Sequence, residues 1–289
     1  MPNPWLDRRV ICYAHQGGAL EAPSNTLFAF RRALEIGADA LELDVHASTD
    51  RRLIVCHDPT VDRTSDGEGE IARLTSEELG KLDNAYWFVP DEDAVRDRPL
   101  ANYVRRGLAP ADPAFGFAFL DDVLEEFAGT PVNIDIKRTA PEVEPYEALL
   151  AEVLANAGRG DDVIVTSFHD SAIDEFRRLA PGISTAAGPT DTAELVRASR
   201  RDASPPDSVL RHHALQVPAY YMDIPVVDEK LVAFAREHGI AVHVWTIDDR
   251  DEMARLLDLG VDGIMSDRPS VLAELLAERG LTWRGSAGG

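Results

Sequence analysis

Two histidines and a pair of acids in the N-terminal part of this 289-residue chain have the types and spacing needed for acid–base chemistry beside a cation. His15 and His57 flank Glu42 and Asp44, and a single residue separates the two acids within an apolar run. Side chains two residues apart on a strand point to the same face, and adjacent carboxylates repel unless a proton or a cation lies between them. Histidines supply an acid and a base near neutral pH. The segment therefore predicts a metal-assisted hydrolase site.

A later apolar run repeats this spacing with an acid and a lysine, Asp135 and Lys137. Lysine is rare in this chain, so a lysine at this position is informative. Together with Glu42 and Asp44, Asp135 could hold a hard cation through oxygen ligands, and Lys137 could face an anionic group of a substrate. Trp245 lies near the end of another apolar run, and we expect it on the wall of the site.

Each of these residues also has a purely structural interpretation. Taken alone, Glu42 and Asp44 favour a buried ion pair over a functional site by roughly two to one. His15 could be a hydrogen-bonded core residue, His57 could belong to a turn, and Lys137 could simply pair with its neighbouring acid. The combination favours a site, because all of these polar groups fall at the ends of expected strands.

Short apolar runs alternate with helical patterns along the chain, which predicts parallel strands connected by helices. The expected strands are residues 10–15, 40–45, 53–57, 132–137, 163–168, 183–187, 214–217, 241–247 and 263–266. The expected helices are residues 26–36, 140–156, 171–179, 190–199, 228–238, 250–259 and 269–279.

Nine strands are one too many for an eight-fold barrel, and the spacing between two of them explains the excess. Only residues 46–52 separate the second and third runs, whereas parallel neighbours need a crossover of roughly a dozen residues. We therefore expect a β-hairpin, which places residue 44 opposite about residue 56 and returns His57 to the level of Asp44. The remaining strands predict a TIM (β/α)8 barrel, whose active site lies at the carboxyl ends of the strands.

The predicted domain is one barrel over residues 8–283 with a small insertion after the hairpin. Residues of about 58–118 break the rhythm of strands and helices, and we expect them to lie on the barrel mouth. Residues 284–289 are expected to form a flexible tail.

The composition restricts the partners of the chain. It has 51 acids against 29 Lys and Arg, a formal charge of −22, which argues against nucleic acid and anionic membranes. Cys12 and Cys56 lie in apolar runs and are expected to be buried free thiols. No secretion signal and no stretch long enough for membrane insertion is recognisable, so we expect a cytoplasmic protein. The sequence leaves the oligomeric state unknown.

The ordered set of motifs resembles the glycerophosphodiester phosphodiesterase family, over about residues 10–275. The motifs are His15-Gln16-Gly17, Pro23-Ser24-Asn25-Thr26, Glu42-Leu43-Asp44-Val45, His57-Asp58, Asp135-Ile136-Lys137, Trp245-Thr246 and Gly260-Val261-Asp262-Gly263-Ile264-Met265-Ser266-Asp267-Arg268-Pro269. The segment 60–67 also looks like the start of the family's insertion.

The resemblance implies a role for each matching position. His15 and His57 would be the general acid and base, and the metal ligands for Mg²⁺ or Ca²⁺ would be Glu42, Asp44 and Asp135. Lys137 would bind phosphate, with Gln16 and Trp245 as further substrate contacts. The implied reaction converts a small-molecule glycerophosphodiester into glycerol phosphate and an alcohol.

The chain departs from the family pattern at three positions. Gln16 replaces an arginine and cannot supply its charged fork, which affects rate and substrate identity most. Ser24 replaces a glutamate, and Asp135 is a shorter acid than the usual glutamate. Three alternatives remain: a lysophospholipase D-type phosphodiesterase, a non-catalytic binding protein with a degraded site, and another metal-dependent barrel hydrolase. The lysolipid alternative needs an acyl groove, which the alternating residues Phe115, Phe117 and Phe119 could line unless they form strand core.

Overall fold

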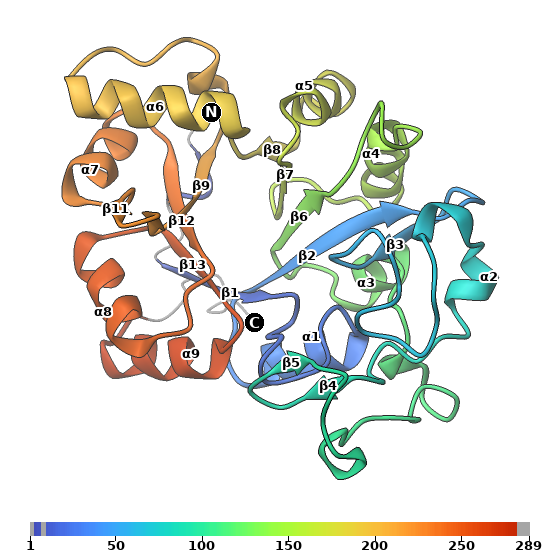
Figure 1. Ribbon diagram of the computed structural model, residues 1–289. Helices are drawn as coiled ribbons and strands as arrows, with labels where there is room; N and C mark the ends of the chain where they lie inside the picture. The colour runs from blue at the N-terminus through green and yellow to red at the C-terminus, as the bar shows by residue number, and fades with distance from the viewer. Residues whose placement is uncertain (1–2, 7–9, 282–289) are drawn as a thin grey trace.

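The computed structural model describes residues 3–6 and 10–281, and its centre is a parallel barrel surrounded by helices (Figure 1). A bridge between Ala186 and Ala214 joins the first and last strands, so the barrel is nearly closed. This confirms the expected TIM (β/α)8 fold. In hydrogen-bonded order the strands are β8 (Ser184–Thr185), β7 (Val163–Thr166), β6 (Val132–Ile136), β2 (Ala40–Ala47), β1 (Ile11–His15), β13 (Gly263–Ser266), β12 (Ala241–Trp245) and β9 (Ala214–Pro218).

The larger helices lie outside the strands and bury one apolar face each against them (Figure 1). They are α1 (Leu27–Glu35), α3 (Leu120–Glu126), α4 (Glu147–Asn156), α5 (Asp170–Leu179), α6 (Pro189–Arg201), α7 (Glu229–Glu237), α8 (Arg250–Leu259) and α9 (Pro269–Glu278). Helix α3 was not expected from the sequence. Helix α4 begins seven residues later than predicted, because Pro141 and Pro145 disfavour helical backbone at the residues before them.

Strand alternation separates the core from the site. Along β2, Leu41, Leu43 and Val45 point outward into the core beneath the helices. Glu42 and Asp44 have the opposite parity and point into the barrel. The register aligns Glu42 with His15 of β1 and Asp44 with Asp135 of β6, so three strands bring their polar residues to one level.

The expected hairpin is present, and it places His57 as predicted. Strand β3 (Leu53–Val55) pairs antiparallel with β2, with Val55 opposite Val45. One further main-chain bond joins Cys56 N–H to the Asp44 carbonyl at 3.0 Å. Strand β3 ends two residues earlier than expected, so His57 lies just beyond it.

The insertion packs beside the barrel mouth, against the hairpin and the β1–α1 loop. It contains α2 (Ser76–Leu79), β4 (Phe88–Val89), β5 (Asp93–Ala94) and three 3₁₀ turns, Ile71–Arg73, Leu100–Asn102 and Pro113–Phe115. Phe117 and Phe119 form a small core with Ile54 of β3, and Phe115 stacks on Phe28 of α1 at 4.6 Å. The three phenylalanines are therefore packing residues.

Several other expectations concern the chain as a whole. Cys12 and Cys56 are buried free thiols, as expected. Within the described residues, no helix is long and apolar enough to cross a membrane. The tail at 284–289 and both ends of the predicted domain, residues 8 and 283, lie outside the described residues.

Candidate active site

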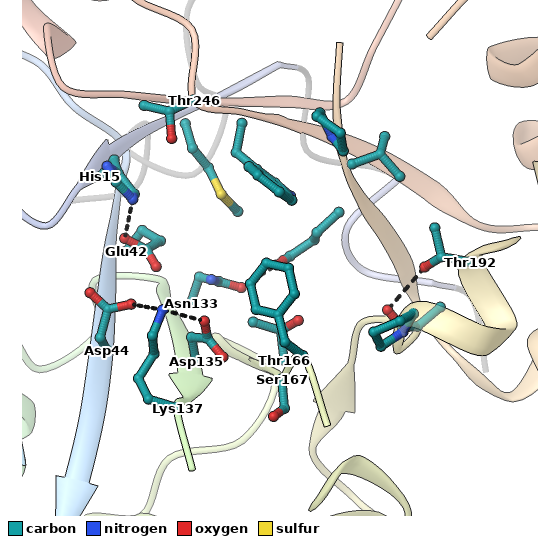
Figure 2. A pocket seen from close by; sticks show the side chains of 18 of the residues that line it. His15, Glu42, Asp44, Asn133, Asp135, Lys137, Thr166, Ser167, Thr192 and Thr246 are labelled. Atoms are coloured by element: carbon teal, nitrogen blue, oxygen red, sulfur yellow. Dashed lines mark hydrogen bonds and ion pairs between the residues drawn. The ribbon is translucent and has the colours of Figure 1, made fainter. Parts of the chain in front are cut away.

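A cavity of about 460 Å³ opens at the carboxyl ends of the barrel strands (Figure 2). One part of its wall is polar and brings six of the predicted residues together with Asn133: His15, Glu42, Asp44, His57, Asp135 and Lys137. The other part is mainly apolar: Phe168, Ala187, Pro189, Val217, Pro218, Tyr221, Trp245 and Met265. The cavity therefore suits a substrate with one charged and one less polar portion.

His15, the last residue of β1, is held between two acids. Its Nδ1 is 2.6 Å from Asp267 Oδ1, and its Nε2 is 3.8 Å from Glu42 Oε2. Burial lowers the pKa of His15, but Glu42 and Asp267 outweigh this effect and raise it to about 10. A carboxylate at Nδ1 fixes the orientation of the ring. Asp267 is itself held, since its main-chain N–H donates to Asp248 Oδ1 at 2.7 Å.

His57 is held in a similar way from the loop after β3. Its Nδ1 is 2.8 Å from Asp58 Oδ1, and Arg63 Nε donates to the other oxygen of Asp58, also at 2.8 Å. Burial would raise the pKa of Asp58, but its bonds to His57 and Arg63 hold that pKa well below its usual range. Asp58 and Arg63 lie within motifs quoted from the sequence, yet nothing in their spacing indicated this chain of contacts.

Lys137 lies between two of the predicted metal ligands, as Figure 2 shows. Its Nζ is 3.1 Å from Asp44 Oδ1 and 3.0 Å from Asp135 Oδ2. Burial would raise the pKa of Asp44, but Lys137 lowers it below the ordinary value. Burial raises the pKa of Asp135 to about 6 and, together with the Asp44 charge, that of Glu42 to about 8.

The site contains oxygen atoms that could bind a metal ion and that are not engaged in hydrogen bonds among the described residues. Asp135 Oδ1 and Asn25 Oδ1 are buried and have no hydrogen-bond partner among the described residues. Asn25 also donates to Asp44 Oδ2 at 3.4 Å, so both unused oxygens adjoin the same carboxylate pair. In the described part of the chain no three His, Cys, Asp or Glu side chains are already arranged around a metal position. The donor chemistry fits a hard divalent cation, and Lys137 provides the positive charge in the arrangement shown.

The two remaining predicted residues differ in their placement. Trp245 lies on the cavity wall, where its ring packs edge-to-face against Phe168 at 5.7 Å. Gln16 is buried and is not part of that wall. Its main-chain N–H donates to Glu42 Oε2 at 3.1 Å, and its side-chain Nε2 lies 3.5 Å from His15 Nε2. Contact of Gln16 with a substrate stays a prediction.

The apolar part of the wall was largely missed by sequence reasoning. Phe168 follows β7, and the strand-end position was its only signal. Tyr221 lies in a small hairpin after β9, formed by β10 (Tyr220–Tyr221) and β11 (Ile224–Pro225), which no motif marks. Phe168 and Tyr221 remain 63% and 66% exposed, so this wall is open to a ligand.

The fold and the site have the features of a hydrolase for an anionic substrate: a parallel barrel with two carboxylate-held histidines, buried acids and one lysine around one cavity. The profile of the Glycerophosphoryl diester phosphodiesterase family matches residues 15–271. The chain belongs to this family. The expected enzyme class and reaction are thereby confirmed: it is a phosphoric diester hydrolase acting on glycerophosphodiesters. Members of the family generally depend on a divalent metal ion.

Individual relatives agree with this assignment. A glycerophosphodiester phosphodiesterase of Caldanaerobacter subterraneus subsp. tengcongensis is 32% identical, over 94% of this chain and all of that protein. One of Bacillus subtilis is 28% identical, over 91% of this chain and 85% of that protein. A crystal structure of a putative glycerophosphoryl diester phosphodiesterase from Silicibacter pomeroyi shares the fold with a TM-score of 0.74, at 22% identity over 97% and 99% of the two chains.

Proposed function

We propose that the cavity is the catalytic centre and that His15 and His57 are its acid–base pair. The supporting observation is that each ring meets a carboxylate at Nδ1 while both rings line one cavity with three buried acids. A carboxylate that accepts from Nδ1–H leaves Nε2 to exchange protons with the substrate. One ring donates a proton to the departing alcohol oxygen, and the other accepts a proton from the attacking oxygen.

Glu42, Asp44 and Asp135 are the side chains that would hold the metal, either Mg²⁺ or Ca²⁺. The ion would supply charge neutralisation for the phosphodiester. Support comes from the unused oxygen of Asp135 and from the burial of all three acids. Lys137 is the remaining cation on the wall, and we assign it to the phosphate of the substrate.

The test is release of glycerol 3-phosphate from a panel of glycerophosphodiesters by the wild type, His15→Ala and His57→Ala. Each substitution is expected to lower kcat by roughly 10²–10⁴, as loss of a general acid or base does. Chelation with EDTA should abolish activity, and Mg²⁺ or Ca²⁺ should restore it. His238→Ala, at the residue that follows α7, is the matched control and should keep wild-type turnover. Near wild-type kcat in either active-site variant would make that histidine structural, and full activity after exhaustive chelation would remove the metal assignment.

A lysophospholipid is a second candidate substrate, favoured by the apolar wall. Tyr221 belongs both to that wall and to the β10–β11 hairpin, whose side chains Met222 and Ile224 are 82% and 66% exposed. An acyl chain could leave the cavity along these residues. The phenylalanines at 115, 117 and 119 do not line the cavity and supply no such groove. A cytoplasmic location stays a prediction from the sequence.

A further inference from the structure

The main-chain ladder between β2 and β3 ends just before His57. Its last regular pair is Val45 with Val55, and the bond from Cys56 N–H to the Asp44 carbonyl follows it. His57 is therefore the first residue of the loop that leaves the hairpin. Its ring is oriented by Asp58, but a bond to the ring does not fix the main chain that carries it.

Beyond these main-chain bonds, a side chain of β2 forms one further hydrogen bond to the segment that follows β3. His46 Nε2 is 3.2 Å from the carbonyl oxygen of His57, and His46 is only 4% exposed. A carbonyl oxygen can only accept a hydrogen bond, so Nε2 of His46 must carry the proton. His46 lies two residues after Asp44 on the same strand. The strand that presents Asp44 to the cavity thus also holds the backbone of His57.

His46 does not take part in the wall of the substrate cavity. It lines a separate cavity of about 280 Å³, together with Arg51, Arg138 and Tyr146. Both arginines are already paired with acids: Arg138 Nε is 3.1 Å from Glu142 Oε2, and Arg51 Nη1 is 3.6 Å from Glu144 Oε1. Any effect of His46 on the reaction must therefore pass through a neighbour.

We propose that His46 is a positioning residue that fixes His57 relative to Asp44 through the His57 carbonyl. This inference rests on the proposed catalytic role of His57. Asp58 and Arg63 set the direction of the His57 ring, whereas His46 sets the place of its main chain. The role needs only a donor at the position of Nε2, and a glutamine side chain also supplies an N–H donor.

The experiment compares His46→Leu, which cannot donate, with His46→Gln, which can. Displacement of a catalytic group by about 1 Å can cost up to 10²-fold in rate, so we expect His46→Leu to lower kcat about 10-fold with KM within about 2-fold. His46→Gln should recover kcat to within about 3-fold of the wild type, since the donor is kept. His46→Met replaces the leucine variant if circular dichroism shows that the latter does not fold. His238→Leu is the matched control, because His238 Nδ1 also lies 2.9 Å from a main-chain carbonyl, that of Phe234 on the distant helix α7.

A double-mutant cycle shows whether His46 acts through His57. In a His57→Ala background, His46→Leu should cause no further loss of kcat, because the group that it positions is gone. A second loss of about 10-fold in that background would show an independent structural effect and overturn the proposal. So would a fully active His46→Leu variant, or a His46→Gln variant as slow as His46→Leu. If His57→Ala alone keeps wild-type kcat, the catalytic role of His57 fails first and this inference fails with it.

Discussion

At the scale of single residues, Gln16 is the departure from the family pattern with the clearest consequence. Its neutral amide lies beside His15 and its main chain contacts Glu42, in a site with three buried acids. An arginine side chain there would be attracted by these carboxylates and would bring a charged fork close to the polar part of the cavity. The resemblance to the family implies that this fork binds phosphate.

We therefore predict that Gln16→Arg raises kcat/KM on glycerophosphocholine by roughly 10- to 100-fold. Hydrogen bonds to charged groups contribute about 1.5–3 kcal/mol, and about 1.4 kcal/mol corresponds to a factor of ten in rate. Gln16→Met is the neutral control and should show no gain. A fall in kcat/KM for Gln16→Arg would mean that the buried pocket has adapted to an uncharged side chain, and that Gln16 determines specificity instead.

The sequence allowed the relative positions of individual residues to be predicted where strand geometry determines them. Glu42, Asp44 and Asp135 could be placed together because strand alternation and the hairpin leave few other arrangements. The contact from Asp58 to Arg63 lies within the loop after β3, and the contact from His15 to Asp267 joins the end of β1 to the loop after β13. Loop conformation depends on tertiary packing, so no spacing rule could supply these partners.

At the scale of elements, the β10–β11 hairpin is the feature on which the proposed lysolipid route depends. Periodicity did not reveal it, because its two strands have only two residues each. The β2–β3 hairpin was predictable, since the short connection excluded a parallel crossover. Only the β2–β3 hairpin belongs to the barrel sheet, whereas β10 and β11 form a separate two-stranded sheet.

The β10–β11 hairpin also yields a prediction about lysolipids. If an acyl chain passes over it, the double variant Met222→Ser/Ile224→Ser should lower kcat/KM on lysophosphatidylcholine on the order of 10-fold, because each methylene removed from water contributes about 0.8 kcal/mol. Activity on glycerophosphocholine should be unchanged. Leu100→Ser/Val104→Ser alters two exposed apolar residues of the insertion and serves as the control. Equal kcat/KM values on the lysolipid for the variant and the wild type would contradict this route for the acyl chain.

At the scale of the whole molecule, the barrel interior has a polar end, which contains the proposed site, and an apolar end. The carboxyl ends of the strands carry the acids and histidines, as is general for this fold. The opposite end is filled by Trp5, Tyr13 and small side chains from neighbouring strands, and Met265 of the same cluster lines the cavity above them. His243 of β12 lies among them, with its ring centroid 6.1 Å from that of Trp5 and 5.2 Å from that of Tyr13. Gly263 leaves room for this packing, because a Cβ there would lie 2.9 Å from both His243 and Tyr13.

His243 makes the stability of the barrel depend on pH. It is fully buried, neither ring nitrogen has a hydrogen-bond partner among the described residues, and burial lowers its pKa to about 3. In the unfolded chain the imidazole of His243 has a pKa near 6.5. Below that pH the unfolded state therefore binds a proton that the folded state does not bind. The stability associated with the neutral ring is therefore complete above pH 6.5 and is lost as the pH falls toward 3.

His243→Leu removes this titrating group while keeping an apolar side chain in the barrel. Between pH 7 and pH 5 the free energy of unfolding of the wild type should fall by about 2 kcal/mol more than that of His243→Leu, since each pKa unit corresponds to about 1.36 kcal/mol. Urea unfolding of both proteins at the two pH values measures this difference, and all other titrating groups cancel in the comparison. The absolute stability of the variant does not matter, because only the change with pH is compared. Parallel pH dependences for the two proteins would show that His243 is protonated, or partnered, inside the folded barrel.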